Sequence, residues 1–201
     1  MLLAKIQLNK GSLIEKISGV KATNTLAIFK NSQIGQSLYF STSADLDGFG
    51  AFTGVKTIVF VINPTADTKL FLDNNADKLE ITGGNFSGTG LTENTVRTLD
   101  GTTTDTDAAS LYKWQMVISE FSAGIDFATD LEIDPTAIMS LGFEIHLYDE
   151  ILTTANKNKL IERFLHSYPE LTPRENVTAS LMNKPTDLSN RNDISGAYNL
   201  R

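Results

Sequence analysis

Cysteine is absent from this 201-residue chain, and histidine occurs only twice, at His146 and His166. Without cysteine the chain can form no disulfide, no zinc–thiolate site and no cysteine nucleophile. Two histidines are too few for a histidine-rich metal site, and no Gly-x-Ser-x-Gly, P-loop or dinucleotide motif occurs. We therefore expect a protein that binds a partner, with no enzymatic activity and no resident cofactor.

Clustered basic residues and long apolar runs are missing as well. The net charge is −7 and the lysines and arginines are scattered singly, so we expect no nucleic-acid partner, because such a surface repels a phosphate backbone. No run approaches the ~20 apolar residues that a membrane span requires. The first ten residues have neither a long apolar stretch nor a small-residue cleavage site. We expect no signal peptide, synthesis in a cytoplasm and no membrane partner.

What the chain does contain is a series of short extended segments up to about residue 148. Residues 56–62 (Lys-Thr-Ile-Val-Phe-Val-Ile) are the most strand-like, and their run of β-branched residues without clean alternation predicts a central strand covered on both faces. Asp100-Gly101 favours positive φ and predicts a hairpin tip. Many short strands predict an all-β sandwich. Further strands are predicted at residues 26–29, 36–40, 69–72, 78–82, 94–99, 113–119 and 142–148.

The spacing of the apolar residues changes after Leu152 from a period of two to the 3.6 of a helix. This change predicts one helix near residues 153–167, capped by Thr153 or Thr154 and stopped by Pro169. The residues predicted to pack this helix against the sheets are Leu160, Ile161, Phe164 and Leu165.

The last 32 residues are polar and cannot bury much apolar surface on their own. We therefore divide the chain into a sandwich domain at residues 1–169 and an extended C-terminal arm at residues 170–201. Apolar residues recur along the arm, and we interpret them as anchors for a partner subunit. The anchors are Leu171, Leu181, Leu188 and Tyr198.

Several motifs resemble those of the concanavalin A-like, laminin-G-like superfamily. Residues 34–40 (Ile-Gly-Gln-Ser-Leu-Tyr-Phe) are similar to its early Gly-x-x-Leu-x-Phe strand, and residues 56–64 to its next long strand. Residues 95–101 and 114–118 resemble its hairpin and the tryptophan-containing strand that follows. Residues 141–153 (Leu-Gly-Phe-Glu-Ile-His-Leu-Tyr-Asp-Glu-Ile-Leu-Thr) are the most specific, since they resemble the closing motif that leads into a short helix.

The resemblance covers residues 20–168 and implies a two-sheet antiparallel jelly-roll sandwich with one short C-terminal helix, followed here by the polar tail. This chain departs from the family pattern in two places. Phe60 stands where tryptophan is common, and Asn156 and Lys157 occupy the start of the helix, where an acidic residue is often found. The capping box of the helix is therefore missing.

Some glycoside hydrolases of this fold carry Glu-x-Asp-x-x-Glu on one strand, and Glu132 and Asp134 match its first two positions. The third position is Ala137, and Pro135 interrupts the strand. A retaining or an inverting mechanism needs a second catalytic carboxylate, so we interpret this segment as a solvated loop and predict no catalytic residue.

Two other groups of residues are candidate binding sites. Members of the superfamily hold calcium in loops at one rim, and the resemblance implies hard oxygen ligands here at Asp45, Asp47, Asp73 and Asp77. Aspartate in these turns also has a purely backbone explanation. Glu144, His146 and Tyr148 share one strand face and are candidate ligand-binding residues, or else one half-buried face of a strand. Trp114 is predicted to pack in the core in preference to stacking on a sugar.

Two functions remain open. The first is a non-enzymatic structural and adhesive protein on the outside of a bacteriophage particle, because domains resembling this one occur in capsid-decoration proteins, head fibres and tail fibres. Its location would be the virion, its partners other virion proteins in a homo- or hetero-oligomeric assembly, and it would bind host surface glycans weakly. The alternative is a free lectin or glycoside hydrolase of the same superfamily.

Overall fold

The apolar stretch predicted at residues 56–62 is the middle of β7 (Phe52–Pro64), the strand around which the larger sheet is built. The computed structural model describes residues 1–9, 12–15, 18–32, 34–74, 76–98, 103–142 and 144–167. The order of strands in this sheet is β12 (Thr103–Asp105), β11 (Leu91–Thr98), β13 (Gln115–Phe127), β7, β14 (Met139–Leu141), β5 (Gly35–Phe40) and β4 (Ile28–Ser32).

A second branch of the same sheet starts beside β14. β15 (Glu144–Tyr148) pairs with β7 and with β1 (Leu2–Asn9), and β1 pairs with β2 (Ser12–Glu15). The strand predicted at residues 142–148 corresponds to β15, whereas β14, which lies just before it, was not predicted. β14 and β15 both pair with β7 but have different neighbours on the other side. Leu141 lies opposite Ile62 and His146 opposite Val59, so the register along β7 shifts between them.

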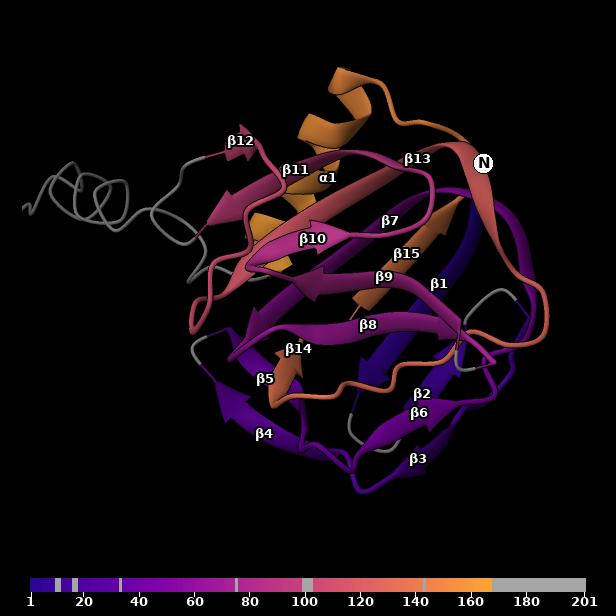
Figure 1. Ribbon diagram of the computed structural model, residues 1–201, viewed down its shortest axis with the longest axis vertical. Helices are drawn as coiled ribbons and strands as arrows, with labels where there is room; N and C mark the ends of the chain where they lie inside the picture. Colours follow the sequence, from indigo (N-terminus) through magenta and orange to yellow (C-terminus); the bar gives the residue numbers. More distant parts are fainter. Residues whose placement is uncertain are drawn as a thin grey trace, which may run out of the picture.

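The opposing layer is assembled from two smaller sheets. One consists of β10 (Asn85–Ser87), β9 (Ala76–Thr82) and β8 (Thr68–Asp73), and the other of β3 (Thr23–Thr25) and β6 (Asp45–Asp47). Residues 132–133 lie between them, since Glu132 forms a bridge with Leu72 and Ile133 forms one with Leu46. Figure 1 shows β8, β9 and β10 in front of β7 and β13, with the helix behind these two strands.

The main core lies between the two layers. Ile58, Phe60 and Ile62 of β7 point into it. The ring of Phe60 lies edge-on to the rings of Phe71 and Phe86, with ring centroids 5.2 and 6.3 Å apart. Phe60 thus fills the core from the position where tryptophan is common. Val59 and Val61, at the alternate positions, are equally buried but belong to a second apolar cluster on the opposite face of the sheet. The prediction that this strand is covered on both faces is confirmed.

The second cluster is covered by α1 (Thr154–Ser167). Leu160 and Ile161 of the helix are buried in it together with Trp114, so the predicted core position of Trp114 is confirmed. Thr153 caps the helix, because its Oγ1 accepts a hydrogen bond from the backbone N–H of Asn156 at 3.3 Å. Within the described residues no helix combines the length and the apolar character needed to cross a membrane.

The predicted fold class, a two-sheet antiparallel β-sandwich with one short helix after the last strand, is confirmed. β11 and β12 pair with Arg97 opposite Thr103, as the predicted hairpin requires, while its predicted tip at Asp100-Gly101 lies outside the described residues. The segment at residues 131–134 was wrongly interpreted as a solvated loop, since its backbone joins the two halves of the second layer. Two groups of predicted residues lie outside the described part of the chain. They are the side chains of Phe164 and Leu165 and the whole arm at residues 170–201 with its four predicted anchors.

Candidate functional site

The predicted trio of Glu144, His146 and Tyr148 lies on the face of the larger sheet that α1 covers. Glu144 Oε2 lies 3.0 Å from His146 Nε2, and the Tyr148 hydroxyl lies 3.5 Å from His146 Nδ1. Lys5 Nζ contacts Glu144 Oε1 at 2.8 Å, and Arg163 of the helix approaches Glu144 Oε2 at 3.6 Å. His146 is fully buried. Glu144 is also buried and Tyr148 is only partly exposed, so the structure favours a supporting role, and ligand binding by these residues stays a prediction.

The surroundings of Glu144 decide its charge. Burial raises the pKa of Glu144, but the hydrogen bonds and charges of His146 and Lys5 outweigh burial and lower the pKa to about 2. The carboxylate is therefore ionised at neutral pH although it is buried beneath the helix. Burial also raises the pKa of Tyr148, which keeps its hydroxyl protonated.

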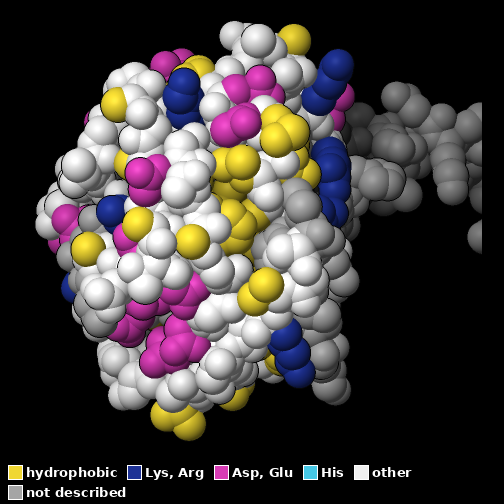
Figure 2. Space-filling model, turned by 90° about the vertical axis from the view of Figure 1, so that its right-hand side faces the viewer, with side chains coloured by type: hydrophobic (Ala, Val, Ile, Leu, Met, Phe, Trp, Pro, Cys, Tyr) yellow, Lys and Arg dark blue, Asp and Glu magenta, His cyan; other side chains and the backbone are white. Residues whose placement is uncertain are grey.

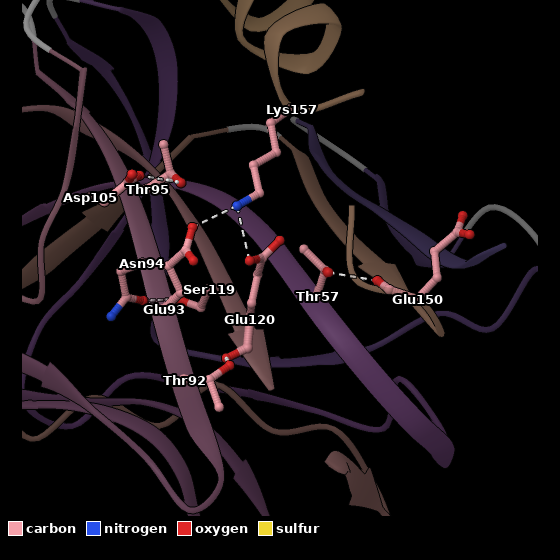
Figure 3. A network of polar contacts seen from close by, with 10 residues as sticks. All are labelled: Thr57, Thr92, Glu93, Asn94, Thr95, Asp105, Ser119, Glu120, Glu150 and Lys157. Carbon is pink, nitrogen blue, oxygen red and sulfur yellow. Dashed lines mark hydrogen bonds and ion pairs between the residues drawn. The ribbon is translucent and has the colours of Figure 1, made fainter. Parts of the chain in front are cut away.

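A second charge cluster, shown in Figure 3, joins the start of α1 to the larger sheet. Lys157 Nζ donates to Glu93 Oε1 at 2.8 Å and to Glu120 Oε2 at 2.9 Å. Glu120 is buried, and its Oε1 has no hydrogen-bond partner among the described residues. Burial lowers the pKa of Lys157, but its bonds to the two carboxylates outweigh burial and raise it. This cluster supports the helix and was not predicted from the sequence.

The aspartates predicted to bind calcium do not form one cluster. Asp73 accepts backbone N–H groups from Ala128, Thr129 and Asp130 at 3.0, 2.8 and 3.1 Å. Burial raises the pKa of Asp73, but these bonds outweigh burial and lower it. The carboxylate therefore has a structural role in holding the loop at residues 128–130.

Asp45 and Asp47 do not join a group of metal ligands among the described residues. Asp47 is exposed, while Asp45 is partly buried and its Oδ1 lacks a hydrogen-bond partner in the described part of the chain. Asp77 lies in β9, but its side chain is outside the described residues. Across the ranges that the structure describes, no three His, Cys, Asp or Glu side chains are placed to hold a metal ion together. Calcium binding stays a prediction.

On the face shown in Figure 2, acidic side chains gather in patches while lysines and arginines are scattered, in keeping with the net charge of −7.

A different set of residues displays two exposed apolar side chains, Tyr112 and Ile138, where three loops meet. The loop that follows β7 meets the loop before β13 and the loop before β14. The backbone N–H of Tyr112 donates to the Pro64 carbonyl at 2.7 Å, and the N–H and Oγ1 of Thr65 both donate to the Ile138 carbonyl, at 3.1 and 2.6 Å. We call Pro64, Thr65, Tyr112, Lys113 and Ile138 the Tyr112 rim.

Tyr112 is held in this rim in an unusual backbone conformation. Its φ is 58°, in the left-handed region, and its side chain is 73 % exposed. A bulky residue in this region costs ~1–2 kcal/mol, and such strain persists only where the surroundings impose it. Besides the bond to Pro64, the Gln115 side chain clamps the loop by bonding both the N–H and the carbonyl of Ser110, at 3.1 and 2.8 Å. A strained backbone that displays an aromatic ring to solvent suggests a contact surface.

Sequence reasoning missed Tyr112. It lies one residue before the predicted strand at residues 113–119, which in the structure begins only at Gln115. The one available signal was an aromatic residue outside the alternation of that strand, two positions before Trp114. That signal does not separate Trp114, which is buried beneath α1, from Tyr112, which is exposed.

No protein-family model matches this chain, and no curated protein matches it in sequence. Among solved structures it is similar to the binding domain of Paraclostridial Mosquitocidal Protein 1, with a TM-score of 0.55 and 12 % sequence identity over 82 % of this chain. The chain spans about half of that structure, 52 % of its length. It is also similar to domain 4 of AbnA, a GH43 extracellular arabinanase from Geobacillus stearothermophilus solved in complex with arabinotriose. Here the TM-score is 0.51 and the identity 11 %, over 77 % of this chain and 95 % of that one. Both likenesses establish the β-sandwich fold.

Proposed function

We propose that this chain is a non-enzymatic adhesive domain that binds glycans weakly through the Tyr112 rim. The observation that carries the proposal is the exposed ring of Tyr112 on a clamped, strained loop. Aromatic rings provide a flat apolar face beside a polar hydroxyl, which suits the mixed surface of a sugar. Exposed loops on a rigid β scaffold are also where binding residues concentrate.

The rim supplies polar groups beside the ring. Lys113 follows Tyr112 in the chain and is exposed, and Ile138 adds an apolar side chain that is 39 % exposed. A single exposed ring contacts one or two sugar units, so binding should be weak. The similarity to AbnA domain 4, which was solved with arabinotriose, supports a glycan as the ligand class.

The setting that we propose for this domain is the outside of a bacteriophage particle, as a capsid-decoration, head-fibre or tail-fibre component. The support comes from the sequence: a laminin-G-like sandwich is joined to a polar arm at residues 170–201 with recurrent apolar residues. In this setting the arm docks on a neighbouring virion subunit while the sandwich faces the host surface. Mass spectrometry of purified particles tests the setting.

The proposal of a non-enzymatic role rests on Glu132 and Asp134. They lack a third carboxylate, because Ala137 occupies that position. The backbone N–H of Ala137 donates to Thr68 Oγ1 at 3.1 Å. Incubation with β-glucans should release no reducing sugar. Release that disappears in a Glu132→Gln variant would favour the alternative, a glycoside hydrolase.

Glycan binding is tested by titrating arabinotriose into the protein and following chemical shifts and saturation-transfer signals by NMR. We expect a dissociation constant in the millimolar range that rises at least tenfold in Tyr112→Ala, because the stacking surface is lost. Ile151→Ala is the matched control, since Ile151 is an exposed apolar residue outside the rim, and it should bind like the wild type.

A Tyr112→Gly variant separates binding from folding. Glycine adopts positive φ without steric cost, so this variant should unfold at the same urea concentration as the wild type or a higher one. It should nevertheless lose binding as Tyr112→Ala does. Unchanged arabinotriose binding in Tyr112→Gly, or no binding by the wild type to arabinotriose or to polysaccharide from bacterial cell surfaces, would refute the proposed role of the rim.

A further inference from the structure

One edge of the larger sheet is open to a further strand. β4 is the last strand of its branch, and it pairs with β5 alone among the strands that the structure describes. It lies at the lower rim of the molecule in Figure 1. The pairing with β5 is continuous from Ile28 opposite Tyr39 to Ser32 opposite Gly35, without a register shift. A regular edge of this kind presents backbone donors and acceptors in the spacing that another strand needs.

The usual means of protecting a sheet edge are missing or withdrawn at β4. Proteins blunt an edge with a short strand, a bulge, a proline or a projecting lysine. β4 has five residues and no proline, while the edge strands β12, β10 and β3 have three residues each. Its one charged side chain, Lys30, folds back over the ring of Tyr39 on β5, with Nζ 3.3 Å from the ring centroid. The lysine therefore does not project beyond the edge.

Two apolar side chains at the start of β4 are displayed to solvent. Leu26 is 69 % exposed and Ile28 is 49 % exposed. Leu26 has a φ of 61°, and the Asn24 side chain clamps its turn by bonding both the N–H and the carbonyl of Ala27 at 3.0 Å. As at Tyr112, a strained turn presents a large apolar side chain.

We propose that the C-terminal arm of a second copy of this chain adds a strand to β4, using residues 176–182. This segment (Asn-Val-Thr-Ala-Ser-Leu-Met) alternates Val177, Ala179 and Leu181 with Thr178 and Ser180, the period of a strand with one apolar face. Its apolar face matches Leu26 and Ile28. In strand addition the backbone bonds supply affinity and alternate side chains supply specificity.

The length of the chain permits this docking between copies. The helix ends at Ser167, and 34 residues follow it (201 minus 167). Fully extended, they reach about 110 Å, far enough to span from one sandwich to the next. The proposal is independent of glycan binding, because it involves neither Tyr112 nor any other residue of the rim.

The absence of cysteine from the chain allows a direct test by disulfide trapping in the full-length protein. One variant carries Ile28→Cys, and its partners carry a single cysteine at Val177, Ala179 or Leu181. Each pair is mixed, oxidised and examined by non-reducing electrophoresis and mass spectrometry. At least one arm position should trap a mixed dimer with Ile28→Cys at ten times or more the yield obtained with Ile151→Cys, an exposed control away from β4.

A Leu26→Asp, Ile28→Lys double variant supplies a second readout. It should reduce self-association of the full chain at least tenfold in sedimentation velocity, whereas Ile151→Lys should not. Three results would overturn the proposal. The first is trapping with Ile28→Cys that is no better than with the Ile151→Cys control, and the second is that Ile28→Cys forms disulfide dimers only with itself. The third is a disulfide within one chain in a variant that carries Ile28→Cys and an arm cysteine in the same molecule. The last two would mean that β4 pairs with another β4 or with its own arm.

Discussion

Among single residues, Glu144 beneath α1 is a buried charge that its neighbours balance. Glu144 is buried, yet it is surrounded by Lys5, His146 and Arg163 and stays ionised with a pKa of about 2. A buried charge of this kind stabilises the fold only as long as its partners remain, because an uncompensated buried charge is costly. The residues that seemed suited to a ligand are therefore satisfied by one another.

The low pKa of Glu144 makes stability depend on pH. A folded-state pKa of about 2, below the ordinary 4.5, means that this contribution is fully present above pH 4.5 and is lost as the pH falls towards 2. Glu144→Gln should lower the free energy of unfolding by about 3 kcal/mol at pH 7, and the difference from the wild type should shrink between pH 4.5 and 2. Urea unfolding across this range measures it.

The wild type alone cannot isolate the effect of Glu144, because Asp73 also has a lowered pKa and contributes to the loss of stability in acid. The difference in stability between the wild type and Glu144→Gln removes the contribution of Asp73. Glu162→Gln, on an exposed position of α1, is the control and should leave the pH profile unchanged. A Glu144→Gln difference that stays constant down to pH 2 would show that the ionised carboxylate is not what stabilises this region.

At the scale of elements, the helix is held by one lysine where an acidic residue was expected. The first turn of α1 has no acidic residue, and a cation near a helix N-terminus is unfavourable to the helix dipole. Lys157 is nevertheless suited to this place, because it neutralises Glu120 of β13 and Glu93 of β11. The lysine at this position, where the motif that the sequence resembles often has an acidic residue, is therefore explained by contacts across the sheet.

Removing Lys157 should loosen the contact between the helix and the sheet. Lys157→Met leaves Glu120 buried without a charge partner, so the free energy of unfolding should fall by about 3–5 kcal/mol. Trp114 is the sole tryptophan and lies in the same apolar cluster, so its fluorescence should shift to the red if the helix separates.

Two further variants make this test specific. Lys159→Met, at an exposed position of the same helix, should change stability by less than about 0.5 kcal/mol. Lys157→Met combined with Glu120→Met should recover most of the lost stability, because well-packed apolar residues can replace a buried ion pair. If the double variant is no more stable than Lys157→Met alone, the loss comes from packing and not from the unpaired charge.

At the scale of the whole molecule, the sandwich and the arm should separate cleanly. The buried apolar residues that the structure describes fall between Ala4 and Ile161, and residues 170–201 are polar in sequence. Truncation after Tyr168 should therefore leave the thermal unfolding midpoint within a few degrees of the full chain, as measured by circular dichroism. The truncated protein should fail to incorporate into the particle that we propose as its setting.

Either of two results would contradict this division. Unfolding of the truncated protein would make the arm part of the core. Incorporation at normal occupancy would assign docking to the sandwich itself.

Local patterns in the sequence carried most of the fold. The β-branched run at residues 56–62 and the change of apolar period after Leu152 each predicted an element that the structure confirms. The predicted Asp-Gly turn at residues 100–101 lies outside the described residues, but β11 and β12 pair on either side of it. These signals are visible in one stretch of chain because strand, turn and helix impose different spacings on apolar residues. Five strands of three residues, β3, β6, β10, β12 and β14, were missed, since three residues are too few to show a period. The longer strands β1 and β2 at the start of the chain were not predicted either.

The sequence by itself therefore determined the class of fold, the central strand, the helix and its cap, and the burial of Trp114. Only the tertiary structure decided which polar residues face solvent. Glu144 and His146 alternate with apolar residues as an exposed face would, but α1 covers that face because the chain returns over it after Leu152. Tyr112 became a candidate site because loops distant in sequence meet around it, through bonds to Pro64 and the clamp from Gln115. Exposure depends on what other segments cover, and local spacing carries no information about that.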